Sequence, residues 1–138
     1  MSVTFTGRCL CGTLRYECGP PVIPPCLCHC ESCRRASGAH VVAWATVARD
    51  SFRVITGTLN SWASSPPVTR QYCAGCGSQI TYAHKDSPGT IDITIATLDS
   101  PDSMSPADHV WMEDAVAWDQ PRDGLLQHAR SRQVPSTP

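Results

Sequence analysis

The nine cysteines constrain this chain of 138 residues more than any other feature, because most of them stand in short, regular spacings. The segment from Cys26 to Arg35 contains four cysteines within ten residues. Two further pairs flank it in the sequence, Cys9 with Cys11 and Cys73 with Cys76. The spacings C-x-C and C-x-x-C are typical of metal sites, so the fold must bring sulfur atoms together.

A metal is favoured over disulfides as the partner of these thiols. The first nine residues hold no apolar export segment, and no apolar run approaches the roughly 18 residues of a membrane helix. We therefore expect a soluble, cytoplasmic protein, in a compartment where thiols stay reduced. The odd number of cysteines also argues against a complete disulfide framework. Zinc is the first choice for sites built only from thiolates.

Composition predicts one folded domain and excludes some partners. Hydrophobic residues make up 41% of the chain and charged residues 17%, as in globular proteins. The net charge is -1 without long runs of either sign, so binding to nucleic acid through phosphate neutralisation is not expected. We expect a single zinc domain over residues 1–126. Residues 127–138 are polar and lack periodicity, which predicts a flexible C-terminal tail.

The predicted fold class is mainly β. Short segments rich in alternating or β-branched residues are separated by proline and glycine, and no segment has a long helical period. Short helical turns are predicted near residues 30–35 and 48–51. We expect strands at residues 13–17, 40–47, 52–56, 59–62, 68–72, 79–82 and 90–96, with 52–56 and 59–62 paired as a hairpin.

The first predicted metal site combines two distant cysteine pairs, each placed in a turn between strands. Cys9 and Cys11 would join Cys73 and Cys76 around one ion. Four thiolates form a closed tetrahedral site with no room for substrate, so the expected role is structural. The alternatives are that the pairs bind separately, or that one pair is simply buried thiol.

The second predicted metal site consists of Cys28, Cys30 and Cys33 on one tight turn. Three protein ligands with an open fourth position are typical of catalytic zinc, which water or substrate completes. A closed, structural site is the alternative, because Cys26 would face the same side of a strand as Cys28, and His29 could also turn inward.

Several motifs in order along the chain support a resemblance to a known family. They are Gly7-x-Cys9-x-Cys11-Gly12, Cys28-His29-Cys30-x-x-Cys33-Arg34, Gly38-Ala39, Arg70-x-Tyr72-Cys73-x-x-Cys76-Gly77-Ser78, Leu98-Asp99, and His109 followed by Trp118. Over residues 7–126 the chain resembles the glutathione-dependent formaldehyde-activating enzyme family, which also includes the centromere protein V group.

The resemblance implies a fold, two zinc ions and an activity. The fold would be a β-tent of small antiparallel sheets. Cys9, Cys11, Cys73 and Cys76 would hold a structural zinc, and Cys28, Cys30 and Cys33 a catalytic one. The activity would be that of a carbon-sulfur lyase similar to S-hydroxymethylglutathione synthase. It would make or break a bond between a thiol, glutathione by resemblance, and a small electrophilic carbon such as an aldehyde.

Cationic side chains near the cysteines are candidates for positioning the carboxylates of such a thiol. These candidates are Arg34, Arg35 and Arg70, and His109 is a candidate for donating or moving a proton. The alternative for Arg34 and Arg35 is an exposed surface position, and for His109 a structural hydrogen bond. The tryptophans are expected in the core, where one could also form a wall of a pocket.

A rival prediction is a zinc-stabilised binding or structural module without catalytic turnover. A closed second site that includes Cys26 would favour it. A thioredoxin-like redox role is weaker, because Cys73 and Cys76 lack a strand-to-helix setting. The sequence does not predict the electrophile, the direction of the reaction or the oligomeric state.

Overall fold

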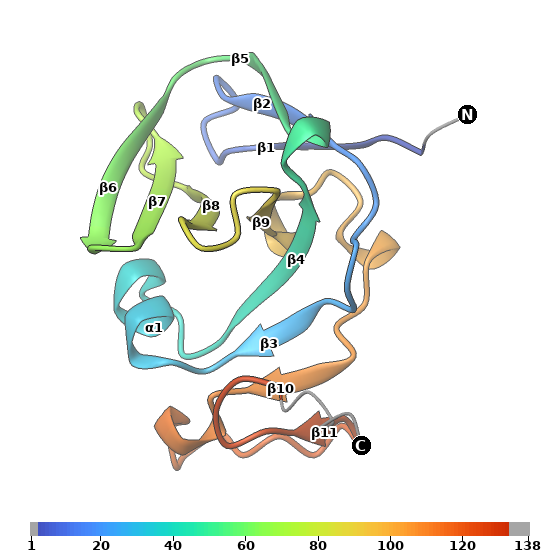
Figure 1. Ribbon diagram of the computed structural model, residues 1–138, viewed down its shortest axis with the longest axis vertical. Helices are drawn as coiled ribbons and strands as arrows, with labels where there is room; N and C mark the ends of the chain where they lie inside the picture. Colours follow the sequence, from blue (N-terminus) through green and yellow to red (C-terminus); the bar gives the residue numbers. More distant parts are fainter. Residues whose placement is uncertain (1–2, 133–138) are drawn as a thin grey trace.

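The structure is a computed structural model that describes residues 3–132 of the chain. Within these residues the fold is mainly β, as predicted, with strands in two sheets, one α-helix and short 3₁₀ turns (Figure 1). The small sheet contains β1 (Phe5–Arg8), β2 (Arg15–Cys18) and β5 (Arg53–Thr56), in the order β1-β2-β5.

The large sheet has eight strands in the order β11-β10-β3-β4-β9-β8-β7-β6. All its pairs are antiparallel except those of β10 with β3 and with β11. In order of sequence its strands are β3 (Cys26–Cys28), β4 (Val42–Ala48), β6 (Leu59–Ser65), β7 (Val68–Cys73), β8 (Gln79–His84), β9 (Thr90–Thr94), β10 (Asp108–Val110) and β11 (Leu126–Gln127).

The predicted hairpin between residues 52–56 and 59–62 is wrong. Strand β5 pairs with β2, and β6 pairs with β7 through the two-residue turn Pro66-Pro67. The reason lies at Gly57, which has a φ of 86° and lies against backbone atoms of Thr13 and Leu14. This close approach places the chain beside the β1–β2 connection, so that β5 and β6 enter different sheets.

The main core lies where the two sheets face each other. Its fully buried side chains include Leu14 and Tyr16 from the small-sheet region and Val47, Ile80 and Ile93 from the large sheet. A second, smaller cluster gathers on the other side of the large sheet, formed by Cys28, Cys33, Val42, Trp44 and Val110. The second predicted metal site is therefore part of a packed apolar cluster rather than of a surface loop.

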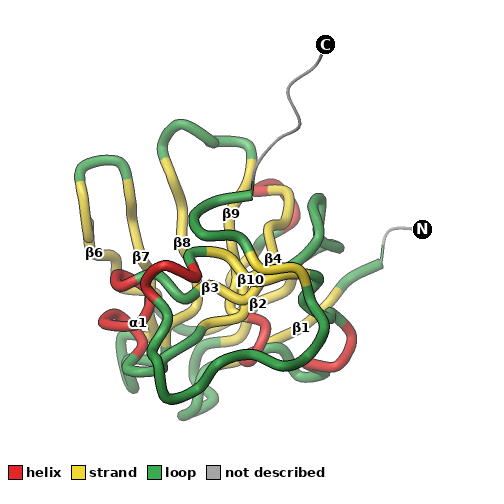
Figure 2. The backbone as a smooth tube through the Cα atoms, turned by 90° about the horizontal axis from the view of Figure 1, so that it is seen from below, coloured by secondary structure: helices red, strands yellow, loops and turns green. Residues whose placement is uncertain are grey.

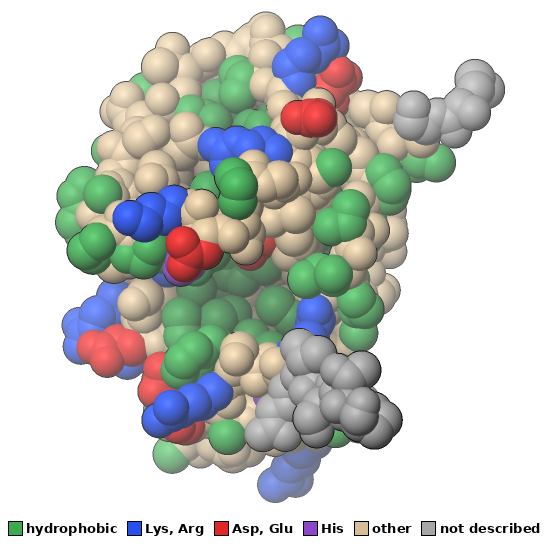
Figure 3. All heavy atoms as spheres, in the orientation of Figure 1, with side chains coloured by type: hydrophobic (Ala, Val, Ile, Leu, Met, Phe, Trp, Pro, Cys, Tyr) green, Lys and Arg blue, Asp and Glu red, His purple; other side chains and the backbone are tan. Residues whose placement is uncertain are grey.

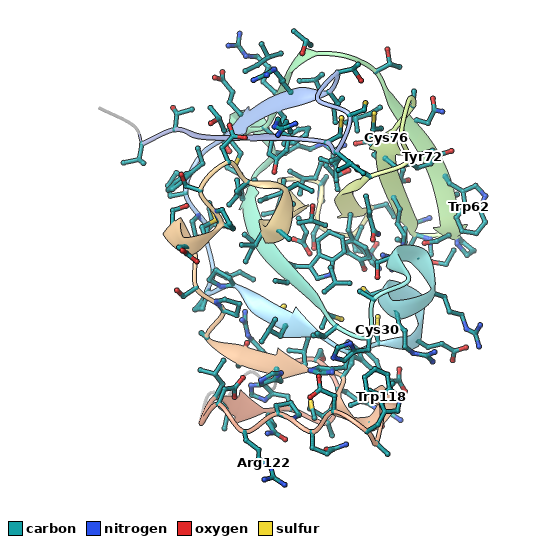
Figure 4. All side chains as sticks on the ribbon, turned by 180° about the vertical axis from the view of Figure 1, so that it is seen from behind. Cys30, Trp62, Tyr72, Cys76, Trp118 and Arg122 are labelled. Atoms are coloured by element: carbon teal, nitrogen blue, oxygen red, sulfur yellow. The ribbon has the colours of Figure 1, made fainter. Side chains whose placement is uncertain are left out.

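The four tryptophans divide between interior and surface, which corrects the expectation that all belong to the core. Trp44 is buried, and Trp111 is half-buried against the smaller cluster. Trp62 and Trp118 are 64% and 75% exposed, and Figure 4 shows Trp62 projecting from the edge of the molecule.

The α-helix α1 (Glu31–Ser37) begins inside the cysteine cluster. The Sγ of Cys30 accepts a hydrogen bond from the N–H of Cys33, 3.2 Å away, and Gly38 ends the helix in a left-handed conformation. The 3₁₀ turns are η1 (Arg49–Ser51), η2 (Ile95–Thr97), η3 (Pro101–Ser103) and η4 (Met112–Asp114). Helix α1 and turn η1 confirm the two predicted helical turns (Figure 2). In residues 3–132 no helix has the length and apolar character needed to cross a membrane.

The predicted domain boundary falls at β11. Beyond it, the carbonyl oxygens of His128, Ala129 and Arg130 accept hydrogen bonds from backbone N–H groups at residues 111–113. The guanidinium of Arg132 also contacts both carboxylate oxygens of Asp108, at 2.6 and 2.7 Å. Residues 127–132 of the predicted tail thus lie along β10 and the turn that follows it, and residues 133–138 of that tail are outside the described residues.

Candidate functional site

The first cysteine cluster joins the two sheets. Cys9 and Cys11 lie in the turn between β1 and β2, and Cys73 and Cys76 lie at the turn between β7 and β8. Their four Sγ atoms all lie within 4.8 Å of one another, so the two pairs form one group. Figure 4 shows sulfur atoms gathered near Cys76, well away from Cys30.

The geometry of this cluster fits a zinc ion. Sulfur atoms about 2.3 Å from a common ion at tetrahedral angles are separated by about 3.8 Å. The Sγ of Cys11 lies 3.5 Å from that of Cys9 and 3.9 Å from that of Cys73. Hydrogen bonds from Ser78 lower the pKa of Cys76 to about 5, which favours the thiolate that a metal requires.

The second cluster is formed by the Sγ atoms of Cys28, Cys30 and Cys33, which also lie within 4.8 Å of one another. Strand β3 supplies Cys28, Cys30 is the N-cap residue of α1, and Cys33 lies in the first turn of this helix. Within residues 3–132, no fourth histidine, cysteine or carboxylate belongs to this group. Three sulfur donors with one side free fit a zinc ion that keeps an open coordination position.

The open side of the second cluster faces a pocket of about 500 Å³. This volume is within the range of small-molecule sites. Figure 3 shows a hollow with hydrophobic side chains between the α1 and β10 region and the rest of the large sheet. The lining includes aromatic side chains (Trp44, Tyr82, Trp111), hydroxyls (Ser32, Ser64, Ser65), carboxylates (Glu31, Asp92, Asp114), Arg70, and Cys26, Cys28, Cys30 and Cys33.

Arg70 connects this pocket to the cysteines. Its side chain is 94% buried, and its two terminal guanidinium nitrogens each lie 3.7 Å from the Sγ of Cys33. The guanidinium also lies over the ring of Tyr82, 5.1 Å from its centroid. Hydrogen bonds from Cys28 and Cys30, together with the positive charge of Arg70, hold the pKa of Cys33 well below its usual range.

Neither Cys26 nor His29 closes the second cluster in this structure. Cys26 lines the same pocket, but its Sγ is outside the three-sulfur group, and burial raises its pKa to about 12. The ring of His29 is buried with its Nε2 2.9 Å from Nδ1 of His109. His109 in turn places its Nε2 2.7 Å from a carboxylate oxygen of Asp123.

Of the four residues predicted to contact a ligand, one lines the pocket and three do not. Arg70 lines the pocket, whereas Arg34, Arg35 and His109 do not. Arg35 makes an exposed ion pair with Glu31 one helical turn away, at 2.9 Å. His109 is 97% buried in the hydrogen-bonded chain with His29, which matches the structural alternative for this residue.

Sequence reasoning missed the pocket residues Tyr82, Asp92 and Asp114, whereas Trp44 and Trp111 are among the tryptophans expected in the core or in a pocket wall. Asp92 lies in a predicted strand, and its polar side chain between Ile91 and Ile93 is the signal in the sequence for a carboxyl on the opposite face from these two residues. Trp111 has a φ of 59°, an uncommon backbone conformation for a large residue. The N–H of Glu31 donates to the carboxylate of Asp114, 3.1 Å away, which ties the loop after β10 to the start of α1.

The two-sheet fold and its two cysteine clusters define a class of small β domains built around metal-binding thiols. Residues 4–114 of this chain match the sequence pattern of a family described as "Glutathione-dependent formaldehyde-activating enzyme". The match spans most of the 138 residues, and the chain belongs to this family. This result confirms the resemblance that the cysteine motifs indicated.

A solved structure supports the fold independently. The crystal structure of a Rhodobacter sphaeroides protein superposes with a TM-score of 0.59 and is 19% identical in sequence. The likeness covers 89% of this chain and 98% of that one. At this identity the comparison shows the shared fold alone. None of the curated proteins searched matches the chain.

Proposed function

We propose that this protein is a zinc-dependent enzyme of the carbon-sulfur lyase type. It would make or break the bond between a thiol, with glutathione as the first candidate, and a small electrophilic carbon such as an aldehyde. The main supporting observation is the set of three sulfur atoms of Cys28, Cys30 and Cys33, which opens onto the pocket and has no fourth protein donor among residues 3–132. Membership of the glutathione-dependent formaldehyde-activating family supports the choice of chemistry.

The cysteines have distinct roles in this proposal. Cys9, Cys11, Cys73 and Cys76 hold one zinc ion that joins the sheets, and Cys28, Cys30 and Cys33 hold a second one at the pocket. A zinc ion in the second site would stabilise the thiolate form of a thiol that enters its open position. The nine unpaired cysteines agree with a reducing, cytoplasmic setting, which is part of the proposal.

Arg70 is the ligand-contacting residue that the geometry favours. Its guanidinium contacts Cys33 and faces the pocket, where it is the only Lys or Arg side chain among the described lining residues. A carboxylate of the incoming thiol would find a buried positive charge there, and charge-assisted hydrogen bonds are the strongest available for such a group. Trp44, Tyr82 and Trp111 would enclose the apolar part of the ligand.

The proposal is tested by metal content and thiol binding together. We expect two zinc ions per chain, and one in the Cys30→Ser variant. Glutathione titrated into the zinc-loaded protein should bind to the wild type and lose at least tenfold in affinity in Cys30→Ser. One zinc ion per chain in the wild type, or unchanged glutathione binding in the variant, contradicts the proposal.

Cys26→Ser is the matched comparison, because it alters a thiol of the same pocket that is outside the three-sulfur group. This variant should keep both zinc ions. If it loses one, Cys26 is a ligand, the second site is closed, and the protein fits a zinc-stabilised binding module instead.

A further inference from the structure

Asp92 is a carboxylic acid in the pocket that none of the roles above uses. It lies on β9 between two buried isoleucines, with its side chain on the pocket face of the large sheet. The hydroxyl of Thr46 donates to its Oδ1 at 2.6 Å. In the described part of the chain, Asp92 has no ion pair with an arginine, lysine or histidine.

Strand register places Asp92 on the same face of the large sheet as Arg70. Thr46, Asp92, Tyr82 and Arg70 are direct cross-strand partners on the consecutive strands β4, β9, β8 and β7. Directly opposed residues of a sheet point to the same face, so the four side chains form one row along the pocket. Neighbouring strands are about 4.8 Å apart, so Asp92 is about 10 Å from the backbone of Arg70, whose guanidinium contacts Cys33. The carboxyl of Asp92 and the three sulfur atoms therefore line the same pocket of about 500 Å³.

The surroundings of Asp92 allow it to gain and lose a proton. Burial raises its pKa, and the hydrogen bond from Thr46 opposes this effect. Tyr82 and His84 on β8, and Asp86 after it, share a pocket wall with Asp92. Besides Tyr82, the ionisable groups that line the main pocket are Glu31 on α1, Arg70 on β7, Asp114 in η4, and the cysteines Cys26, Cys28, Cys30 and Cys33. A partly buried carboxyl without a fixed positive partner is the usual setting of a general acid or base.

We infer that Asp92 moves the proton in the carbon-sulfur reaction, an inference that rests on the proposed function. In the direction of synthesis the carboxylate of Asp92 takes the proton of the thiol. The sulfur lone pair forms the C–S bond with the carbonyl carbon, and the π electrons of the C=O bond move to oxygen. The carboxylic acid of Asp92 then returns its proton to that oxygen as a hydroxyl group. The product contains every atom of both reactants, the carboxylate is regenerated, and cleavage follows the reverse order.

Asp92→Asn is the direct test, because the amide keeps the size of the side chain and an oxygen that accepts from Thr46, but cannot exchange the proton. The reaction of glutathione with labelled formaldehyde would be followed by exchange NMR on the zinc-loaded protein, after subtraction of the uncatalysed rate. We expect the catalysed rate to fall about 100-fold, as for loss of a general acid-base group. Zinc content and the glutathione dissociation constant should stay within twofold of the wild type. A catalysed rate within threefold of the wild type overturns the inference and leaves the proposed function intact.

Two further proteins separate the remaining outcomes. Asp50→Asn, an exposed carboxyl in η1, should match the wild type in rate. Thr46→Val removes the donor that stabilises the Asp92 carboxylate, so the acidic limb of the rate profile should move to higher pH. An unmoved limb assigns Asp92 a merely structural role and overturns the inference. A wild type that does not accelerate the reaction at all overturns the proposed function and, with it, this role of Asp92.

Discussion

The guanidinium of Arg70 lies against the Sγ of Cys33, with both terminal nitrogens 3.7 Å from the sulfur. The two residues are 37 positions apart in the sequence. They meet because the fold places β7, which carries Arg70, close to the first turn of α1, which carries Cys33. A buried positive charge here stabilises a thiolate without occupying a coordination position. Such supporting contacts commonly set the affinity of a metal site.

We predict that Arg70→Met weakens zinc binding at the second cluster by about 10–100-fold, because Cys33 loses its positive neighbour. The zinc affinity of Arg70→Lys should lie between those of Arg70→Met and the wild type, because lysine keeps the charge but cannot place two nitrogens against the sulfur. Competition with a chromophoric chelator measures the affinity. Arg53→Met, which removes an exposed ion pair with Glu17, should bind zinc like the wild type. Equal affinity of Arg70→Met and wild type would show that the contact has no such function.

Removal of a ligand should affect stability more at the first cluster than at the second. The contact between Cys11 and Cys73 connects the small sheet to the large one. Cys28, Cys30 and Cys33, in contrast, lie within one short segment of the chain. We expect Cys73→Ala to lower the free energy of unfolding by about 3 kcal/mol or more, since a structural zinc site contributes folding energy directly. Cys30→Ala should cost less. Urea unfolding with zinc present measures both, and Cys18→Ala, a buried cysteine outside both clusters, should cost only about 1 kcal/mol.

Gly57→Ala should destabilise the protein by about 1–3 kcal/mol. A β-carbon at this position would lie 2.5 Å from the carbonyl oxygen of Thr13, and the φ of 86° disfavours any other residue. Gly89→Ala is the matched control, because a β-carbon there meets nothing within 4 Å. Thermal unfolding should separate the two variants, and equal melting temperatures would refute the assigned role of Gly57.

The ion pair of Asp108 and Arg132 should make the free energy of unfolding depend on pH. The hydrogen bond from Arg132 lowers the pKa of Asp108 below its unfolded value of about 3.9. The pair therefore contributes its full stability above that value and loses it as the pH falls through the lower, folded pKa. We expect Asp108→Asn to cost about 1–3 kcal/mol at pH 7 and progressively less below about pH 4. Urea unfolding across this range tests it, and a cost that stays constant with pH would contradict the assignment.

The sequence was most informative about the sulfur atoms, because ligand spacing is a local property. Both cysteine groups form in the structure as the spacing indicated, and most strands lie where alternation placed them. Strand partners were not local, so the pairing of β5 with β2 was missed. For the same reason the sequence did not predict the row of pocket side chains that contains Asp92 and Arg70. These two residues enter one row only through the register of β9, β8 and β7. The exposure of Trp62 and Trp118 likewise depends on which strand and loop form the edge.

The contact between Cys11 and Cys73 also has a consequence for how the chain assembles. These residues are 62 positions apart, so the β1–β2 hairpin is synthesised long before its sulfur partners exist. Contacts over such separations form late, after local hairpins such as β6–β7. During synthesis, Cys9 and Cys11 therefore lack the other two cysteines of their site until residue 76 has been added. Zinc can therefore close the four-sulfur site, and so join the two sheets, only after the chain has been made through residue 76.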